Sequence, residues 1–167
     1  MQKVHYVNSY LLKVIEEYLA WSTWKSDGIN SKKYLMQAYR NRGVEKQFLK
    51  TYSNAIQSQE KQLLRNAHFY ELGYQLQLEE YHYSLQQGRT KGFNLQKLSD
   101  TLDLSFITNK LKLTCILLSH ESVVKQTYDK GLLSLIIQYL ENSDSLLIPA
   151  VGIYYYAYRA LSEIEEE

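Results

Sequence analysis

The sequence predicts an all-α protein, and three observations lead to that class. The 167 residues include one proline and seven glycines, although a sheet protein of this length normally uses many of both in its turns. Apolar residues recur at steps of three and four, the spacing of one side of a helix. Sixteen tyrosines supply bulk between helices. We expect seven to eight helices, stacked as antiparallel hairpins in a solenoid or irregular bundle, in a single domain over residues 1–167.

The first expected helix covers residues 6–24, whose apolar positions form one broad stripe. Asp27 and Gly28 end this helix. Asn30 or Ser31 can cap the next one, because their side chains can accept a hydrogen bond from a free backbone N–H.

The second helix is expected to run to about Arg42 and to end at Gly43. Its inward side chains are expected to be Tyr34, Leu35, Ala38 and Tyr39. A third helix begins near Val44, and its stripe consists of Phe48, Leu49, Tyr52, Ala55 and Ile56. The polar stretch that follows predicts a break between Gln57 and Lys61.

Residues 63–87 are predicted to form the next helix, with two apolar stripes and therefore neighbours on two sides. Gly88 to Gly92 is the clearest loop in the sequence, and Asn94 is a suitable cap for a helix that starts at Leu95. That helix either continues, or Asp103 caps a separate one. If it continues, its stripe comprises Leu95, Leu98, Leu102, Phe106, Leu113 and Leu117.

The last part of the chain is expected to contain two more helices. A connection over residues 119–131 leads to residues 132–140, which are apolar almost all round and are expected to be buried on several sides. Residues 142–145 form a turn. Pro149 suits the first turn of the final helix, where its missing N–H costs little.

Charge is unevenly distributed along the chain. Residues 1–92 carry 13 basic and 8 acidic side chains (+5), and residues 93–167 carry 6 basic and 10 acidic ones (−4). A basic segment over residues 25–50 includes a candidate patch at Lys32, Lys33, Arg40 and Arg42. Nucleic-acid binding through this patch is one hypothesis, and a solvated helix face is the interpretation that we prefer.

One spacing suggests a metal site. Glu79 and His82 have the i, i+3 arrangement of carboxylate-bridged metal proteins, and His68 and Glu71 lie three turns earlier. That chemistry needs a second copy on a facing helix, and the sequence has none. All four residues fall on a polar stripe, so we expect them to be exposed to water, and we expect no bound metal or cofactor.

Nucleophilic catalysis has little support in the sequence. Cys115 and His120 are five positions apart, about 140° around a helix. Neither a Gly-x-Ser-x-Gly elbow nor a phosphate-binding glycine loop is present. We therefore expect no catalytic residue and no enzyme activity.

The expected compartment is the cytoplasm. The N-terminus lacks the charged start and apolar segment of a secretory signal, and no apolar run approaches the ~20 residues that cross a bilayer. A single cysteine excludes an internal disulfide.

The tyrosines are expected to pack mainly between helices, with their hydroxyls reaching water or a carbonyl. The tyrosines assigned to apolar stripes are Tyr10, Tyr18, Tyr34, Tyr52, Tyr74, Tyr81, Tyr139 and Tyr158. Tyr154, Tyr155 and Tyr156 are consecutive, so they cannot all face one core. At least one of these three should line a groove, and they are the candidate partner-groove residues.

Two resemblances accompany this pattern. Phe69-x-x-Leu72-Gly73-x-x-Leu76 and the similar segment Ile148–Tyr155 resemble the first helix of tetratricopeptide repeats, although the second-helix positions do not match. Segments 66–81, 103–118 and 147–156 are also similar to an all-helical bacterial protein family with no associated activity. That likeness would make the chain one piece of a longer protein, with apolar surface left for missing helices.

The leading functional hypothesis is a non-catalytic protein-interaction module, with a groove lined by tyrosine and flanked by basic residues. The partner would be a protein or peptide, with no membrane contact. The alternatives are a nucleic-acid-associated protein that uses residues 25–50 and a metal-binding carboxylate bundle.

Overall fold

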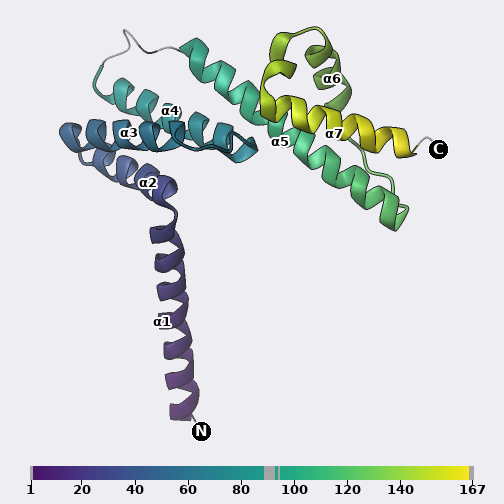
Figure 1. Cartoon of the computed structure of the whole chain (residues 1–167). Helices are drawn as coiled ribbons and strands as arrows, with labels where there is room; N and C mark the ends of the chain where they lie inside the picture. Colours follow the sequence, from purple (N-terminus) through teal and green to yellow (C-terminus); the bar gives the residue numbers. More distant parts are fainter. Residues whose placement is uncertain (1, 89–92, 94, 166–167) are drawn as a thin grey trace. The chain divides into compact units, whose positions relative to one another are not determined.

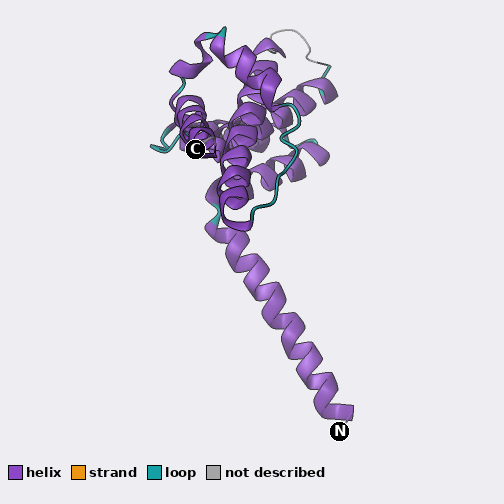
Figure 2. Ribbon diagram, turned by 90° about the vertical axis from the view of Figure 1, so that its right-hand side faces the viewer, coloured by secondary structure: helices purple, strands orange, loops and turns teal. Residues whose placement is uncertain are grey.

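A computed structural model describes residues 2–88, 93 and 95–165 of the chain. The described residues form seven α-helices and one short 3₁₀ helix, and no strand occurs among them (Figures 1 and 2). The all-α prediction is therefore confirmed. No helix in this part of the chain combines the length and the apolar character needed to cross a bilayer.

The chain divides into two compact units, residues 1–59 and residues 60–167. Each is described by itself below. The expectation of one domain over residues 1–167 stays a prediction.

The first unit begins with helix α1, Gln2–Ser26, and helix α2, Gly28–Asn41. The predicted cap at Asn30 or Ser31 is wrong, because Asp27 holds that position. The Asp27 carboxylate accepts hydrogen bonds from the backbone N–H of Asn30 at 3.1 Å and from its side-chain amide at 2.7 Å. An aspartate can satisfy the free N–H groups of a first helical turn, so α2 begins directly after Asp27. Asp27 is the one residue between the two helices.

Helix α3, Glu45–Glu60, follows a turn in which Gly43 has a positive φ of 66°. α2 and α3 are joined through Lys32, whose ammonium group donates a 2.7 Å hydrogen bond to the hydroxyl of Ser58. The buried side chains of the two helices include Met36, Phe48 and Ala55. α3 ends inside the break predicted from the sequence.

Two expectations for α2 are wrong. Tyr34 and Leu35 were expected to face inward, and both are exposed. Met36 is the fully buried residue of this helix. The apolar pattern of α2 is short and is surrounded by lysine and glutamine, so it defines the buried face of the helix poorly. Turning the helix about its axis by one residue position changes which side chain is buried.

The second unit begins its regular structure with helix α4, Ala67–Gln86. Residues 63–66 were expected to be helical and are not, and Leu63 and Leu64 are exposed. The helix starts later because Asn66 caps it, accepting a 3.1 Å hydrogen bond from the backbone N–H of Phe69. α4 ends before Gly88, which has a positive φ of 65°. The rest of the predicted 88–92 loop, residues 89–92, and the predicted Asn94 cap lie outside the described residues.

Helix α5, Leu95–Val124, is a single helix of 30 residues that contacts both α4 and α7. The separate helix proposed to start at Asp103 therefore does not exist. α4 and α5 are linked by a hydrogen bond of 3.2 Å from the amide of Gln77 to the hydroxyl of Thr101. The connection expected over residues 119–131 is shorter than predicted, because the helix continues through Val124.

The predicted core stripe of α5 is wrong, because most of its side chains face solvent. Leu95, Leu102, Phe106 and Leu113 are exposed, whereas Ile107, Leu111 and Leu118 are buried. Taking Leu95 as zero, the exposed set lies within about 20° of it and the buried set lies between about 120° and 160°. α5 thus carries apolar side chains on two faces, and its contacts cover one of them.

The core of the second unit lies where α5, α6 and α7 meet. Helix α6, Leu133–Glu141, is followed by the 3₁₀ helix η1, Asp144–Leu147, and by helix α7, Pro149–Glu165. Pro149 starts α7 as predicted. The buried residues of this core are Ile107, Leu111, Leu133, Ile136, Leu140, Val151 and Tyr155.

The segment between α5 and α6 is held by one buried carboxylate. Glu121 accepts a hydrogen bond from the backbone N–H of Tyr128, and its second oxygen lies 2.8 Å from the ammonium group of Lys130. Lys125 and Gly131, at the two ends of the segment, have positive φ values of 54°. The short turn is therefore fixed to the last part of α5 by side-chain contacts.

Candidate functional site

The three consecutive tyrosines of α7 have three different environments. Tyr155 is buried, and its hydroxyl donates a 3.1 Å hydrogen bond to a carboxylate oxygen of Glu141. Burial, and to a lesser extent that carboxylate, raises the pKa of Tyr155 above its ordinary value of 10.0. Tyr154 is half-buried against the core, and Tyr156 is exposed. One ring of the three is thus free to meet another molecule.

The candidate basic residues are not gathered on one open face. Lys32 is directed at α3, where it bonds Ser58. Arg42 donates a 3.0 Å hydrogen bond to the carbonyl oxygen of Ala38. Lys33 and Arg40 are seven residues apart and share one side of α2. The ammonium group of Lys33 lies 4.9 Å from the ring centre of Tyr34. The four cations therefore point in at least two directions.

The residues considered for metal binding are also separated. His68 and Glu71 approach each other at 4.0 Å on an exposed side of α4. Glu79 is buried, which contradicts the expectation that all four residues face water. Its position three residues from Leu76 and four from Tyr83 places it on the buried face of α4. Within residues 2–88, 93 and 95–165, no three His, Cys, Asp or Glu side chains are grouped closely enough to hold a metal ion.

Cys115 and His120 border the same shallow hollow along α5, together with Ile116, Ser119 and Val123. The thiol of Cys115 donates a weak 3.5 Å hydrogen bond to the carbonyl oxygen of Tyr154. His120 pairs with the hydroxyl of Tyr128 at 2.9 Å. Burial raises the pKa of the Cys115 thiol, which reduces the thiolate fraction that a nucleophile needs.

One hollow of the second unit lies between α5 and α6. We call it the α5–α6 groove, and its volume is about 280 Å³. Its lining consists of Asp103, Phe106, Ile107, Leu132, Leu135, Ile136 and Tyr139. Four of these side chains stand on its open side: Phe106 is 47% exposed, Leu132 55%, Leu135 62% and Tyr139 53%. Ile107 and Ile136 are buried and form its floor.

The lining of the α5–α6 groove is apolar except for one charged side chain. The carboxylate of Asp103 belongs to the lining, and the other lining side chains are aliphatic or aromatic. Asp100 lies one turn earlier on α5, where its carboxylate accepts a 2.7 Å hydrogen bond from the amide of Gln96. A groove with an acidic edge differs from the expected groove flanked by basic residues.

The sequence interpretation missed this groove for a specific reason. Residues 132–140 were expected to be buried on several sides. Leu133, Ile136 and Leu140 of α6 are buried, but Leu135 and Tyr139 of α6 and Leu132, which precedes the helix, are exposed. Phe106 was assigned to the core stripe of its helix. The sequence signal that could have indicated the groove was the second apolar face of α5. A helix that packs against neighbours on one side needs only one apolar face, so a second one indicates a further contact surface.

Comparisons with family models, curated proteins and solved structures each found no match for this chain. The resemblances to tetratricopeptide repeats and to a bacterial helical family therefore stay predictions.

Proposed function

We propose that this chain is a non-catalytic protein-interaction module that binds an amphipathic helix of a partner protein in the α5–α6 groove. The observation that carries the proposal is the row of half-exposed apolar side chains along one open hollow: Phe106, Leu132, Leu135 and Tyr139. Scattered apolar residues are normal on a protein surface, whereas a contiguous apolar patch with a polar edge is typical of a binding site.

A helix is the occupant that the groove fits best. Two helices with a hollow between them present the geometry in which a third helix can lay its apolar side, anchored at positions i, i+3 or i+4, and i+7. The acidic edge at Asp103 favours a partner with a lysine or arginine beside its apolar stripe, because opposite charges at the rim steer encounter and set register.

A displayed library of amphipathic helices tests this proposal with the whole chain. Each peptide carries leucines at the anchor positions and either lysine or glutamate at the flanking position. We expect selection of lysine-bearing helices. Leu135→Asp should weaken their binding by at least about tenfold, since it removes apolar contact and adds a buried charge. Asp103→Lys should reverse the preference toward glutamate.

A matched control is Lys112→Asp, which changes the charge of an exposed residue of α5 outside the groove lining. Recovery of no helix, or equal binding by the Leu135→Asp chain, would contradict the proposal. Binding of labelled single-stranded RNA or duplex DNA that falls steeply with salt and is lost in Lys33→Glu, Arg40→Glu would favour the nucleic-acid alternative.

A further inference from the structure

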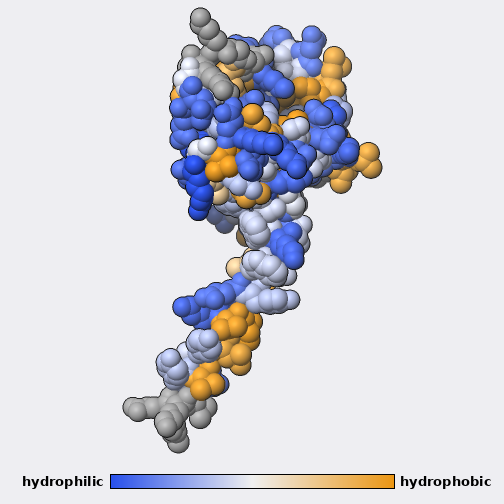
Figure 3. Space-filling view, turned by 90° about the vertical axis from the view of Figure 1, so that its left-hand side faces the viewer, coloured by the Kyte–Doolittle hydropathy of each residue, from blue (hydrophilic) through white to orange (hydrophobic). Residues whose placement is uncertain are grey.

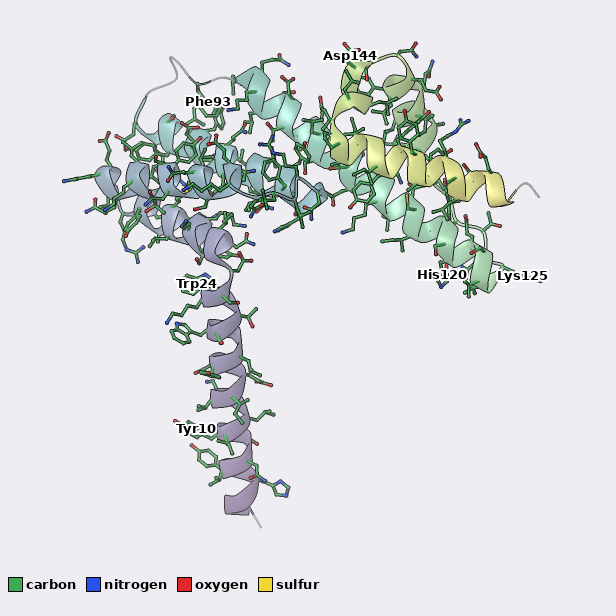
Figure 4. The ribbon with its side chains drawn as sticks, viewed as in Figure 1. Tyr10, Trp24, Phe93, His120, Lys125 and Asp144 are labelled. Atoms are coloured by element: carbon green, nitrogen blue, oxygen red, sulfur yellow. The ribbon has the colours of Figure 1, made fainter. Side chains whose placement is uncertain are left out.

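Helix α1 is the most exposed element of the first unit. Its eleven described large hydrophobic residues, Tyr6 to Trp24, are between 42% and 74% exposed. Within its unit, α1 contacts α2, which follows directly in the chain. In Figure 3, hydrophobic side chains gather along the N-terminal half of α1. Figure 4 shows the rings of Tyr10 and Trp24 extending from the same side of the helix.

The apolar side chains of α1 follow a heptad pattern. Val7, Leu11, Val14, Tyr18 and Trp21 are separated by alternating steps of four and three, which place them within about 80° around the helix. Tyr10, Ile15, Leu19 and Leu12 flank this seam and widen the apolar side to about 200°. This is the pattern of a helix that packs against another helix along its length.

A helix of this composition is stable in water only when its apolar side packs against another element. α1 is rich in β-branched and aromatic residues, which are weaker helix formers than alanine or leucine. Most of the stability of a helix in a protein comes from burial of its apolar side, because propensity alone is marginal in water. The contact with α2 leaves that side open.

We propose that a second copy of this chain covers it, through an antiparallel pairing of the two α1 helices. Between Val7 and Trp21 the apolar arc carries no charge with which to select a partner of opposite sign. Lys13, Glu16 and Glu17 all fall outside it, and Lys13 pairs with Glu17 at 3.9 Å. A heptad seam that is uncharged over this stretch is complementary to itself, and a two-fold axis uses the same patch on both copies.

The position of Lys25 selects the orientation. Lys25 lies at the C-terminal end of the seam, with its ammonium group 4.7 Å from the ring centre of Trp21. A parallel pairing would place the two Lys25 residues side by side, and like charges in contact oppose association. In the antiparallel pairing, with Leu11 opposite Val14, they lie at opposite ends, about 38 Å apart at 1.5 Å per residue.

The register follows from matching the seam positions. Leu11 of one copy lies opposite Val14 of the other, and Val7 lies opposite Tyr18, so a small side chain faces a larger one at each level. Nine apolar side chains at roughly 100 Å² each, half of what a buried aromatic covers, give about 900 Å² per copy. A stable interface of standard size buries about 800 Å² per partner.

Sedimentation equilibrium of the whole chain, from nanomolar to tens of micromolar, tests the association. We expect a dimer whose dissociation constant rises by about a hundredfold in Leu11→Glu, because each interface then buries two unpaired carboxylates. Ser9→Glu is the matched control: it adds the same charge about 160° away, and should leave the dimer unchanged. A chain that stays monomeric, or an assembly that Leu11→Glu leaves intact, overturns the proposal.

Oxidative cross-linking tests the orientation. In a Cys115→Ser background, a mixture of Val7→Cys and Tyr18→Cys chains should form a mixed disulfide dimer, and Val7→Cys alone should not. Efficient cross-linking of Val7→Cys to itself would show a parallel pair and overturn the antiparallel proposal. This inference is independent of the α5–α6 groove: Leu11→Glu leaves helix binding by the groove unchanged, and Leu135→Asp leaves the dimer unchanged.

Discussion

A β-carbon on Gly152 would lie 2.8 Å from the carbonyl oxygen of Leu146. That distance is shorter than any ordinary contact between a side-chain carbon and a backbone oxygen, so the first turn of α7 packs against η1 at a separation that only glycine permits. Backbone atoms on both sides leave no flexible group to move aside.

Gly152→Ala should therefore lower the free energy of unfolding by about 1–3 kcal/mol, the usual cost of forcing extra atoms into a packed site. Urea denaturation measures this change. Gly28→Ala is the control, since a β-carbon on Gly28 meets nothing within 4 Å. A Gly152→Ala chain as stable as the Gly28→Ala chain would show that η1 can move away at no cost.

The carboxylate of Glu121 should determine the order of the segment between α5 and α6. Glu121→Ala removes the acceptor for the N–H of Tyr128 and leaves Lys130 without its counter-charge. We expect a loss of about 2 kcal/mol, below the usual cost of breaking a fully buried ion pair because Lys130 is partly exposed. Hydrogen exchange at the amide of Tyr128 should become much faster.

Glu121→Gln separates the two contacts of that residue. Its amide oxygen can still accept from the N–H of Tyr128, so exchange at this amide should stay slow while the charge is lost. Equal exchange rates in the alanine and glutamine variants would mean that the charge on Glu121, and not the hydrogen bond, orders the segment.

Tyr155 should make stability depend on pH in the alkaline range. Its pKa is raised in the folded state by burial and by Glu141, so folding favours the protonated phenol. The resulting stabilisation is fully present below the ordinary tyrosine pKa of 10.0 and is lost as the pH rises through the higher folded value.

Tyr155→Phe should cost about 1 kcal/mol near neutrality, for one hydrogen bond, and this cost should shrink above the ordinary tyrosine pKa. Urea midpoints measured across the alkaline range report the difference. Tyr156→Phe, which changes the exposed neighbouring ring, should show no such dependence. A cost of Tyr155→Phe that stays constant with pH would mean that the phenol titrates in the folded protein as it does in the unfolded chain.

Much of the fold could be predicted because helical spacing is a local property. The steps of three and four in residues 6–24 gave α1, and Pro149 correctly marked the start of α7. The predicted starts of α2 and α4 were wrong because a capping side chain fixes where each helix begins. Asp27 and Asn66 both cap helices, and their effect depends on the backbone angles that they adopt.

Which face of a helix is covered could not be predicted from spacing. α5 has apolar side chains around Leu111 and around Phe106, and both sets satisfy the same periodicity. The tyrosines show the same limit. Tyr10, Tyr18, Tyr34 and Tyr139 were expected between helices and are exposed, whereas Tyr158 packs against the core as expected. The choice depends on a neighbouring helix that is distant in sequence.

The Cys115 thiol sits at the contact between α5 and α7, with its hydrogen bonded to the carbonyl oxygen of Tyr154. The sulfur is half-buried and borders a hollow that is open to solvent, so a modifying reagent can reach it while the two helices stay packed. A thiol that has been modified can no longer donate this hydrogen bond, so labelling at the native cysteine measures what that single contact contributes to holding α5 against α7.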